Sequence, residues 1–325
     1  MGQGKKYEKV IWYLVCVAII GLTLLGYIKG IFISSDIDES YALAQSYRLA
    51  VGDKLFVDMW ESHQLSAFLG AVFIKIYLAV FGTTEYLVIY LRMIGILMHT
   101  GIGIWLYNAI KKDFSQRISF LVLFLHLNFL PKWVQMPEFE LMHYWFVLMI
   151  FLLLYGYFGK EKRGFLRPAL AGVCVVGSMM SYPTMILLYP FLVIGLCVLE
   201  KQRFGLKGIK RLKSSLYLTL GALISGGSFL VYLLSYQSIS EFMENVSYIF
   251  LDESHSMEET AFKWQYYKIE IGEHFASYFG HMGVALIIVA VALIIRAIIL
   301  WIKEKSLKNF LTKKGVEFVV ISLMV

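Results

Sequence analysis

The sequence predicts an all-α, polytopic transmembrane protein. Hydrophobic residues make up 59% of the 325 residues, charged residues only 16%, and the mean hydropathy is +0.68. One soluble core could not bury that much apolar surface, so a lipid bilayer is the expected solvent. Long apolar runs recur along the chain, and about 20 apolar residues suffice to cross the hydrocarbon. They predict about nine spans, at 10–28, 86–109, 118–134, 141–158, 168–180, 183–199, 215–236, 280–300 and from near 316.

The first span, 10–28, follows the basic head MGQGKKYEK. It lacks the short apolar core and the small-residue cleavage site of a signal peptide, so we expect it to remain in the protein. The lysines of the head predict a cytoplasmic N-terminus. The last apolar run stops after VEFVVISLMV, so we expect the ninth span to be incomplete and the C-terminal spans, 276–325, to be truncated.

A further apolar run, 65–82, carries Lys75 at its centre, where a charge that faces lipid is unfavourable. If this run lies on the outer surface as a juxtamembrane helix, the N-terminal head and the inner loops hold 21 of the 30 basic residues, as the positive-inside rule requires. On the same assignment, 17 of the 23 acids lie outside or at outer helix ends. If 65–82 spanned the bilayer, the basic loops at 111–117, 159–167 and 201–213 would all lie outside. We therefore predict that 65–82 is interfacial.

This topology divides the chain into a membrane module, 1–236, an extracytoplasmic loop, 237–275, and the C-terminal spans. The module contains two outer loops, 34–85 and 131–140. Part of the first, residues 40–51, has the periodicity of an amphipathic helix that lies at the membrane interface. Its predicted apolar face consists of Leu43, Tyr47, Ala50 and Val51.

Acidic residues gather in the two outer loops. The first holds Asp36, Asp38, Glu39, Asp53, Asp58 and Glu61, followed by His63, and the second holds Glu138 and Glu140. Part of this pattern has a structural explanation, because Ser35 and Asp38 have the spacing of a capping box. The PEFE of the second loop likewise suits a helix N-terminus, with Pro137 in its first turn and acids favoured by the helix dipole. Helix capping does not explain the other acids of these loops. Their convergence on one outer surface suggests a functional site.

The residues after the first span resemble a known family. The stretch DIDESYALAQSYRLAVGDKLFVDMWESHQ is similar to the start of the GT-C superfamily of membrane glycosyltransferases. The closest resemblance is to the branch of the protein O-mannosyltransferases and aminoarabinose transferases, where an Asp-Glu pair precedes a Y…A…G pattern, an aspartate and a His-Gln. This chain has Asp38-Glu39, Tyr41, Ala44, Gly52, Asp58 and His63-Gln64 in those places.

A second resemblance lies in LAGVCVVGSMMSYPTMILLYP, residues 170–190. It is similar to the family's pair of helices joined by a tight outer turn. Tyr182 stands in that turn where the family often has lysine, so a phosphate contact expected there must come from another residue.

The resemblance implies a cell-membrane enzyme with an extracytoplasmic active site. Its donor would be a sugar on a polyprenyl phosphate, and its acceptor a glycan, a lipid or a protein. Displacing the lipid phosphate needs a base near the acceptor hydroxyl and positive charge or a metal near the phosphate. The resemblance favours Asp38 as the catalytic carboxylate, with Glu39 and Asp58 beside it. Asp38 with Glu138 and Glu140 could also hold a divalent cation, Mg²⁺ or Mn²⁺.

The candidate substrate-binding residues all lie on the predicted outer face: Asp36, His63, Gln64, Arg92, Lys132 and Tyr182. Arg92 falls within the outer part of a span, so its guanidinium needs a counter-charge or a headgroup. Snorkelling to the interface is its structural explanation. A lone histidine such as His63 is often simply a structural polar group.

Two other classes of function remain open. In a transporter, the acids of residues 34–64 would form an outer vestibule, and charged or broken helices would be expected near the middle of the membrane. A non-catalytic subunit of surface-polysaccharide assembly would tolerate the loss of Asp38. A polysaccharide polymerase would be expected to use arginines in large outer loops. The net charge of +7 does not indicate a nucleic-acid partner, because the basic residues lie in the predicted cytoplasmic loops.

Overall fold

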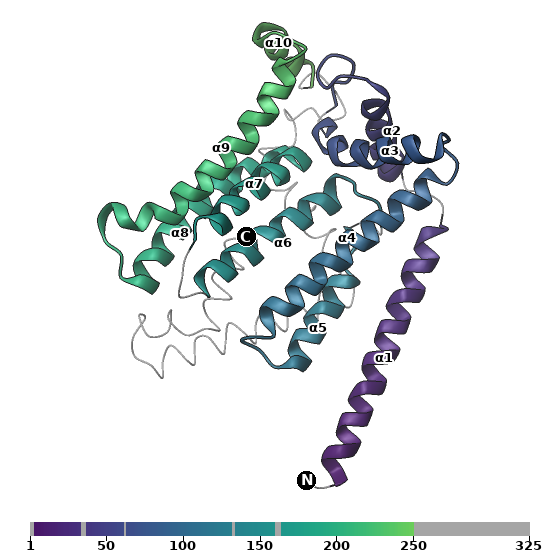
Figure 1. Ribbon diagram of the computed structural model, residues 1–325, viewed down its shortest axis with the longest axis vertical. Coiled ribbons are helices and arrows are strands. Elements are labelled where there is room, and N and C mark those ends of the chain that lie inside the picture. Colours follow the sequence, from purple (N-terminus) through teal and green to yellow (C-terminus); the bar gives the residue numbers. More distant parts are fainter. Residues whose placement is uncertain (1–2, 34–36, 62, 132–133, 160–163, 250–325) are drawn as a thin grey trace, which may run out of the picture.

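A computed structural model describes residues 3–33, 37–61, 63–131, 134–159 and 164–249 (Figure 1). The prediction of an all-α protein is confirmed for these residues, which form helices and no strand. The α-helices are α1 (Gln3–Ile31), α2 (Ile37–Val51), α3 (Ala67–Phe81), α4 (Leu87–Ile110), α5 (Gln116–Leu127), α6 (Phe139–Phe158), α7 (Leu166–Ser181), α8 (Leu188–Phe204), α9 (Lys213–Leu234) and α10 (Ile239–Ile249). Short 3₁₀ helices are η1 (Gln64–Ser66), η3 (Pro183–Leu187) and η4 (Gly208–Leu212).

Six helical segments of the described residues are long and apolar enough to cross a membrane. They are Val10–Ile31, Gln64–Phe81, Leu87–Ile110, Phe139–Phe158, Pro183–Phe204 and Gly208–Leu234. The predicted spans 118–134 and 168–180 form shorter apolar helices, α5 and α7. The predicted spans 280–300 and near 316 lie outside the described residues. The chain therefore has the helices of a membrane protein, while the count of nine spans remains a prediction.

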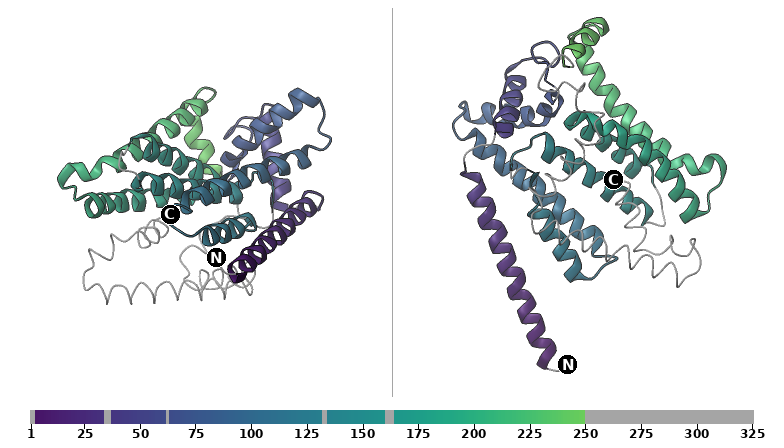
Figure 2. Two further views of the ribbon diagram at one scale, coloured as in Figure 1. Left: turned by 60° about the horizontal axis from the view of Figure 1, so that its bottom comes forward. Right: turned by 180° about the vertical axis from the view of Figure 1, so that it is seen from behind.

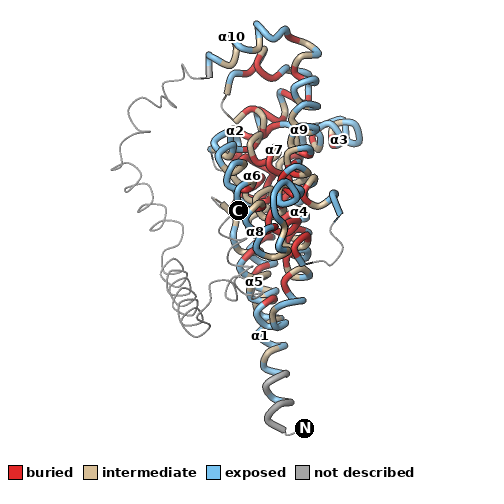
Figure 3. The backbone as a smooth tube through the Cα atoms, turned by 90° about the vertical axis from the view of Figure 1, so that its left-hand side faces the viewer, coloured by how far each residue is buried: buried red, intermediate tan, exposed pale blue. Residues whose placement is uncertain are grey.

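The segment Gln64–Phe81 has the length and composition of a span, yet its direction differs from that of its neighbours. Figures 1 and 3 show α3 running across the direction of α4 and α9, beside α2. Lys75, at the middle of α3, is exposed. The predicted interfacial position of 65–82 agrees with this direction and remains a prediction.

Helix α6 is the centre of the larger core. More than half of its span is buried inside the protein, and Trp145, Tyr157 and Phe158 are among the largest fully buried side chains. Side chains from α4, α7, α8 and α9 pack around it. Helices α7 and α9 approach backbone to backbone, because a Cβ at Gly172 would overlap the carbonyl oxygen of Leu218 and one at Gly221 would overlap that of Ala169.

Helix α1 stands at the edge of this bundle, and most of its outward side chains are exposed (Figures 2 and 3). Two contacts along its length hold it against α5. The ring of Trp12 meets that of Phe120 edge to face at 5.9 Å, and the hydroxyl of Tyr27 donates to the carbonyl oxygen of Leu127 at 2.5 Å.

Helix α2 contains the predicted amphipathic helix 40–51, but the predicted apolar face is wrong in part. Ala50 is buried and Leu43 and Tyr47 are half-buried, whereas Val51 is exposed. The buried face is formed by Glu39, Ala42, Gln45, Ser46, Leu49 and Ala50. Small and polar residues line it because α2 packs closely on α3, where a Cβ at Gly70 would overlap the side chain of Ser46.

Candidate functional site

Glu39 and Arg92 form a buried ion pair near the start of α4. Nε and Nη2 of Arg92 donate to the two carboxylate oxygens of Glu39 at 2.7 and 2.5 Å. The two side chains are only 6% and 4% exposed. The counter-charge that Arg92 needs inside a span is therefore Glu39, and snorkelling does not describe this side chain. A two-pronged contact of this kind fixes orientation as well as charge.

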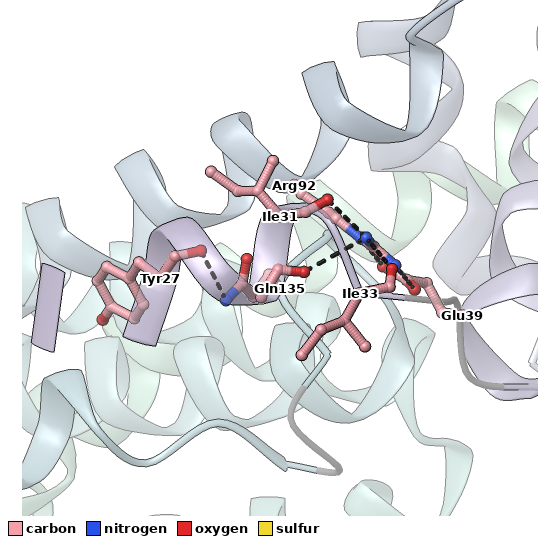
Figure 4. Close-up of polar contacts among 7 residues, drawn as sticks. Tyr27, Ile31, Ile33, Glu39, Arg92 and Gln135 are labelled. Carbon is pink, nitrogen blue, oxygen red and sulfur yellow. Dashed lines mark hydrogen bonds and ion pairs between the residues drawn. The ribbon is translucent and has the colours of Figure 1, made fainter. Parts of the chain in front are cut away.

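The same guanidinium binds the end of α1. Nη1 of Arg92 donates to the carbonyl oxygens of Gly30 at 3.3 Å, Ile31 at 2.7 Å and Ile33 at 2.8 Å (Figure 4). The last carbonyls of a helix have no partner within the helix, and the helix dipole favours a cation there. Arg92 thus joins the first span, the start of α2 and the start of α4. Its donors are occupied by protein groups, which accounts for Arg92 without a substrate phosphate.

Segment 134–138 of the second outer loop passes between α1 and α4. The amide of Gln135 donates to the carbonyl oxygen of Tyr27 at 3.4 Å (Figure 4). A Cβ at Gly30 would overlap the Gln135 side chain, and a Cβ at Gly95 would overlap the Gln135 carbonyl oxygen. Two glycines on facing helices therefore admit the loop, which is why the second outer loop lies directly beside the Arg92 cluster.

Glu138 is the N-cap of α6. One carboxylate oxygen accepts from the backbone N–H of Leu141 at 2.5 Å and the other from that of Glu140 at 2.9 Å. Glu138 is 2% exposed, whereas Glu140 in the first helical turn is half-buried. The helix-start explanation of PEFE thus describes the geometry of Glu138, with Pro137 just before the cap rather than in the first turn.

The residues of the predicted metal site do not form a ligand cluster. In the part of the chain that the structure describes, no group of three or more His, Cys, Asp or Glu side chains is placed to hold a metal ion. Asp36 lies outside the described residues. The Glu138 carboxylate accepts from two backbone N–H groups and so serves as a helix cap.

The loop after α2 is held by its own polar side chains. Asp58 accepts from the backbone N–H of Lys54 at 2.7 Å, and Arg48 binds both the Asp53 carboxylate and the Asp58 carbonyl at 2.6 Å. Gln64 is fully buried, and its amide accepts from the N–H of Phe56 at 2.9 Å. Asp58 is exposed at the surface of this loop, and the described contacts of Gln64 are to backbone.

Asp38 lies one residue before the ion pair, in the first turn of α2, and is half-buried. Tyr41 follows three residues later, which places it next to Asp38 along the helix surface. The hydroxyl of Tyr41 donates to the carboxylate of Glu61, which comes from the loop after α2. A tyrosine hydroxyl and a second carboxylate therefore lie on the same side of α2 as Asp38.

His63 joins segment 34–85 to the start of α6 and the end of α7. Its ring stacks on that of Phe139, with centroids 4.2 Å apart, and lies 5.3 Å from the ring of Tyr182. His143, one turn after Phe139, is 5.9 Å from Tyr182 and 3.4 Å from the hydroxyl of Ser178. The structure thus brings together two predicted binding residues, His63 and Tyr182. Lys132 lies outside the described residues.

Three residues of this region had no role in the sequence analysis: Gln135, Tyr41 as a partner of Glu61, and His143. The sequence could not indicate the position of Gln135. The two glycines that make room for it lie in distant segments, α1 and α4, and glycines alone do not indicate which residue lies between them. His143 follows Phe139 by one helical turn, so the position of PEFE next to α6 could have indicated it.

Comparisons with protein-family models, with curated proteins and with solved structures find no match to this chain.

Proposed function

We propose that this chain is a membrane glycosyltransferase that moves a sugar from a polyprenyl-phosphate donor to an extracytoplasmic acceptor, with Asp38 as its catalytic carboxylate. The observation that carries the proposal is the different placement of the two acids in the Asp-Glu pair. Glu39 is buried on Arg92 and so anchors the first turn of α2 to the end of the first span. Asp38 is held beside it at a half-buried position.

In the proposed reaction, a carboxylate oxygen of Asp38 takes the proton of the acceptor hydroxyl. The acceptor oxygen then bonds to the anomeric carbon of the sugar, and the bond from that carbon to the phosphate oxygen breaks. Its electron pair leaves with the lipid phosphate. A positioned base of this kind contributes about 100-fold to 10,000-fold to rate.

The neighbouring residues have supporting roles in this proposal. Tyr41 and Glu61 form a hydrogen-bonded pair next to Asp38 and would orient the acceptor. Tyr182 presents a partly exposed ring at the outer end of α7, where an aromatic face can stack on a sugar. His63, two residues after Glu61 in the sequence, contacts Phe139 and Tyr182.

The test is sugar transfer by the purified full chain in lipid nanodiscs, using a panel of radiolabelled polyprenyl-phosphate hexoses and pentoses. Asp38→Asn keeps the shape of the side chain and removes the base. We expect the turnover rate to fall about 100-fold or more, with an unchanged melting temperature. Asp53→Asn is the matched control, because Asp53 is a carboxylate of the same loop that pairs with Arg48 at the surface.

Activity of Asp38→Asn within threefold of the parent would exclude Asp38 as the base. Loss of activity in Asp53→Asn as well would indicate a fault of the loop rather than of the chemistry. If the parent transfers no sugar from any donor but moves a solute across a sealed vesicle, the transporter alternative replaces this proposal. If the parent neither transfers sugar nor moves a solute, and it copurifies with a polysaccharide polymerase, the subunit alternative replaces this proposal.

A further inference from the structure

A groove lies at the far end of α8 from Tyr182, where α8 and η4 meet. Its volume is about 430 Å³, within the usual range for small-ligand sites. One wall is apolar and consists of Val193, Ile194 and Val198, on consecutive turns of α8. The mouth is polar and carries Lys201, Gln202 and Arg211. The groove is thus an apolar slot with two cations at one end.

The local fold produces this arrangement. Helix α8 ends at Phe204 and is followed by Gly205, whose φ of 64° lets the chain turn back. The Gly205 N–H donates to the carbonyl oxygen of Glu200. Helix η4 then lies against α8, which brings Arg211 next to Lys201 although ten residues separate them. The turn between α8 and α9 lies at the lower left of Figure 1.

In the described part of the chain, no neighbouring acid neutralises the charge at the mouth. Glu200 is the one acid in residues 200–213, and it is fully buried with the Tyr157 hydroxyl 2.8 Å from its carboxylate. Among the residues that the structure describes, no carboxylate forms an ion pair with Lys201 or Arg211. Two exposed cations beside an apolar slot therefore have no anionic partner within the described ranges.

We infer that this groove binds one anionic glycerophospholipid. An acyl chain would lie along the α8 wall, and the headgroup phosphate would contact Lys201 and Arg211, with the Gln202 amide donating to a phosphate or ester oxygen. The argument rests on position as well as charge. The groove lies where a predicted span ends, so its apolar part faces the acyl chains and its mouth faces the headgroups.

The competing occupant is the chain's own segment 280–314. That segment carries six basic residues, namely Arg296, Lys303, Lys305, Lys308, Lys313 and Lys314, and a single acid, Glu304. Its net charge is therefore positive, which does not complement the two cations. A phospholipid with one anionic phosphodiester and an acyl chain supplies both complementary features.

The experiment is native mass spectrometry of the delipidated full chain, titrated with phosphatidylglycerol or phosphatidylcholine of the same acyl chains. We expect one phosphatidylglycerol per chain, held at least tenfold more tightly than phosphatidylcholine. Each cation near a headgroup is worth about fivefold in affinity, so Lys201→Gln with Arg211→Gln should weaken phosphatidylglycerol about 30-fold. Phosphatidylcholine binding should change little.

The control is Lys207→Gln with Lys210→Gln, which removes the same charge from the same loop but not from the groove. Equal weakening by both double variants would show diffuse surface attraction and overturn the site. Absence of a phosphatidylglycerol preference in the parent would overturn it as well.

A second variant distinguishes lipid from the chain's own segment. Val198→Trp fills the groove, and Ile224→Trp, at an exposed position of α9, is its control. If a lipid occupies the groove, Val198→Trp weakens phosphatidylglycerol binding and leaves the melting temperature of the delipidated chain unchanged. A lowered melting temperature with unchanged lipid binding would assign the groove to residues 280–314. These outcomes do not depend on glycosyltransferase activity.

Discussion

Nε2 of His99 lies 2.8 Å from the carbonyl oxygen of His126, and Nε2 of His126 lies 2.9 Å from the carbonyl oxygen of His99. A carbonyl can only accept, so both rings carry a proton on Nε2. The other nitrogens then accept, from the indole N–H of Trp145 at 2.9 Å and from the hydroxyl of Tyr144 at 2.7 Å. The two rings stack with centroids 4.1 Å apart, so this network joins α4, α5 and α6 with every imidazole nitrogen bonded.

Removing a donor from this network should destabilise the bundle. Trp145→Phe leaves Nδ1 of the buried His99 without a hydrogen bond, and we expect the free energy of unfolding to fall by about 1 to 3 kcal/mol beyond the loss of packing. Trp105→Phe, at a partly exposed position of α4, is the control. Equilibrium unfolding in detergent measures both. Equal effects of the two substitutions would contradict the network.

The Glu39–Arg92 pair should matter far more to stability than the exposed Arg48–Asp53 pair. Removing one partner of a buried pair costs about 3 to 5 kcal/mol, because the other charge stays buried. We therefore expect Glu39→Gln and Arg92→Met to lower the free energy of unfolding by that amount.

Asp53→Asn should lower the free energy of unfolding by at most about 1 kcal/mol, because surface pairs contribute little. Arg92→Lys should also be less stable than the parent, although it keeps the charge. An ammonium cannot bind Glu39 and three carbonyls as the guanidinium does. Full stability of Arg92→Lys would mean that charge alone holds α1 and α2 together.

Gly95→Ala should displace the second outer loop. The new Cβ would overlap the Gln135 carbonyl oxygen, so either α4 or segment 134–138 must move. Gly101→Ala is the matched control in the same helix, because nothing lies within 4 Å of its Cβ position. We expect a lower melting temperature for Gly95→Ala and an unchanged or higher one for Gly101→Ala. Thermal unfolding of both variants side by side makes the comparison.

The stability of the first turn of α10 should depend on the protonation of Glu241. Ser238 N–H donates to the Glu241 carboxylate at 2.7 Å, and Glu241 N–H donates to the Ser238 hydroxyl at 3.2 Å, as in a capping box. Hydrogen bonds from the Ser238 backbone and then its side chain lower the pKa of Glu241. A depressed pKa means that this capping contribution is complete above the unfolded pKa of about 4.3 and is lost as the pH falls through the folded pKa.

Carboxyl NMR titration of labelled glutamate checks this prediction. The midpoint of Glu241 should lie below about 4.3 in the parent and rise toward that value in Ser238→Ala. Ser247→Ala, in the last turn of the same helix, should leave it unchanged. A midpoint of about 4.3 in the parent would show that the capping box does not form in solution.

The helices could be predicted because each apolar run is long and continuous, so length and composition suffice. Side-chain partners could be predicted only where a physical requirement was strict. Arg92 had to find a counter-charge, but nothing in the local pattern indicated that Glu39, 53 residues away, would supply it. The buried face of α2 was predicted incorrectly because large apolar residues usually mark the core, whereas here Ser46 meets Gly70.

The candidate site was predictable as a region and less so as a set of roles. The two loops do lie against each other, because His63 of segment 34–85 stacks on Phe139 of segment 131–140. The convergence of their acids on one site remains a prediction. The spacing could not show that the Glu138 carboxylate binds the backbone N–H groups of Glu140 and Leu141. Such a role depends on which N–H groups lie within reach of a carboxylate, and only the folded chain sets this.

The bond between Arg92 and the end of α1 has a consequence for biosynthesis. The guanidinium and the carbonyl of Ile31 are 61 residues apart, which corresponds to about 3 to 12 seconds of translation. Throughout that interval the nascent first span carries bare terminal carbonyls and Glu39 has no cation. A chain that stalls before residue 92 would thus lack the donor that joins the end of α1 to Glu39.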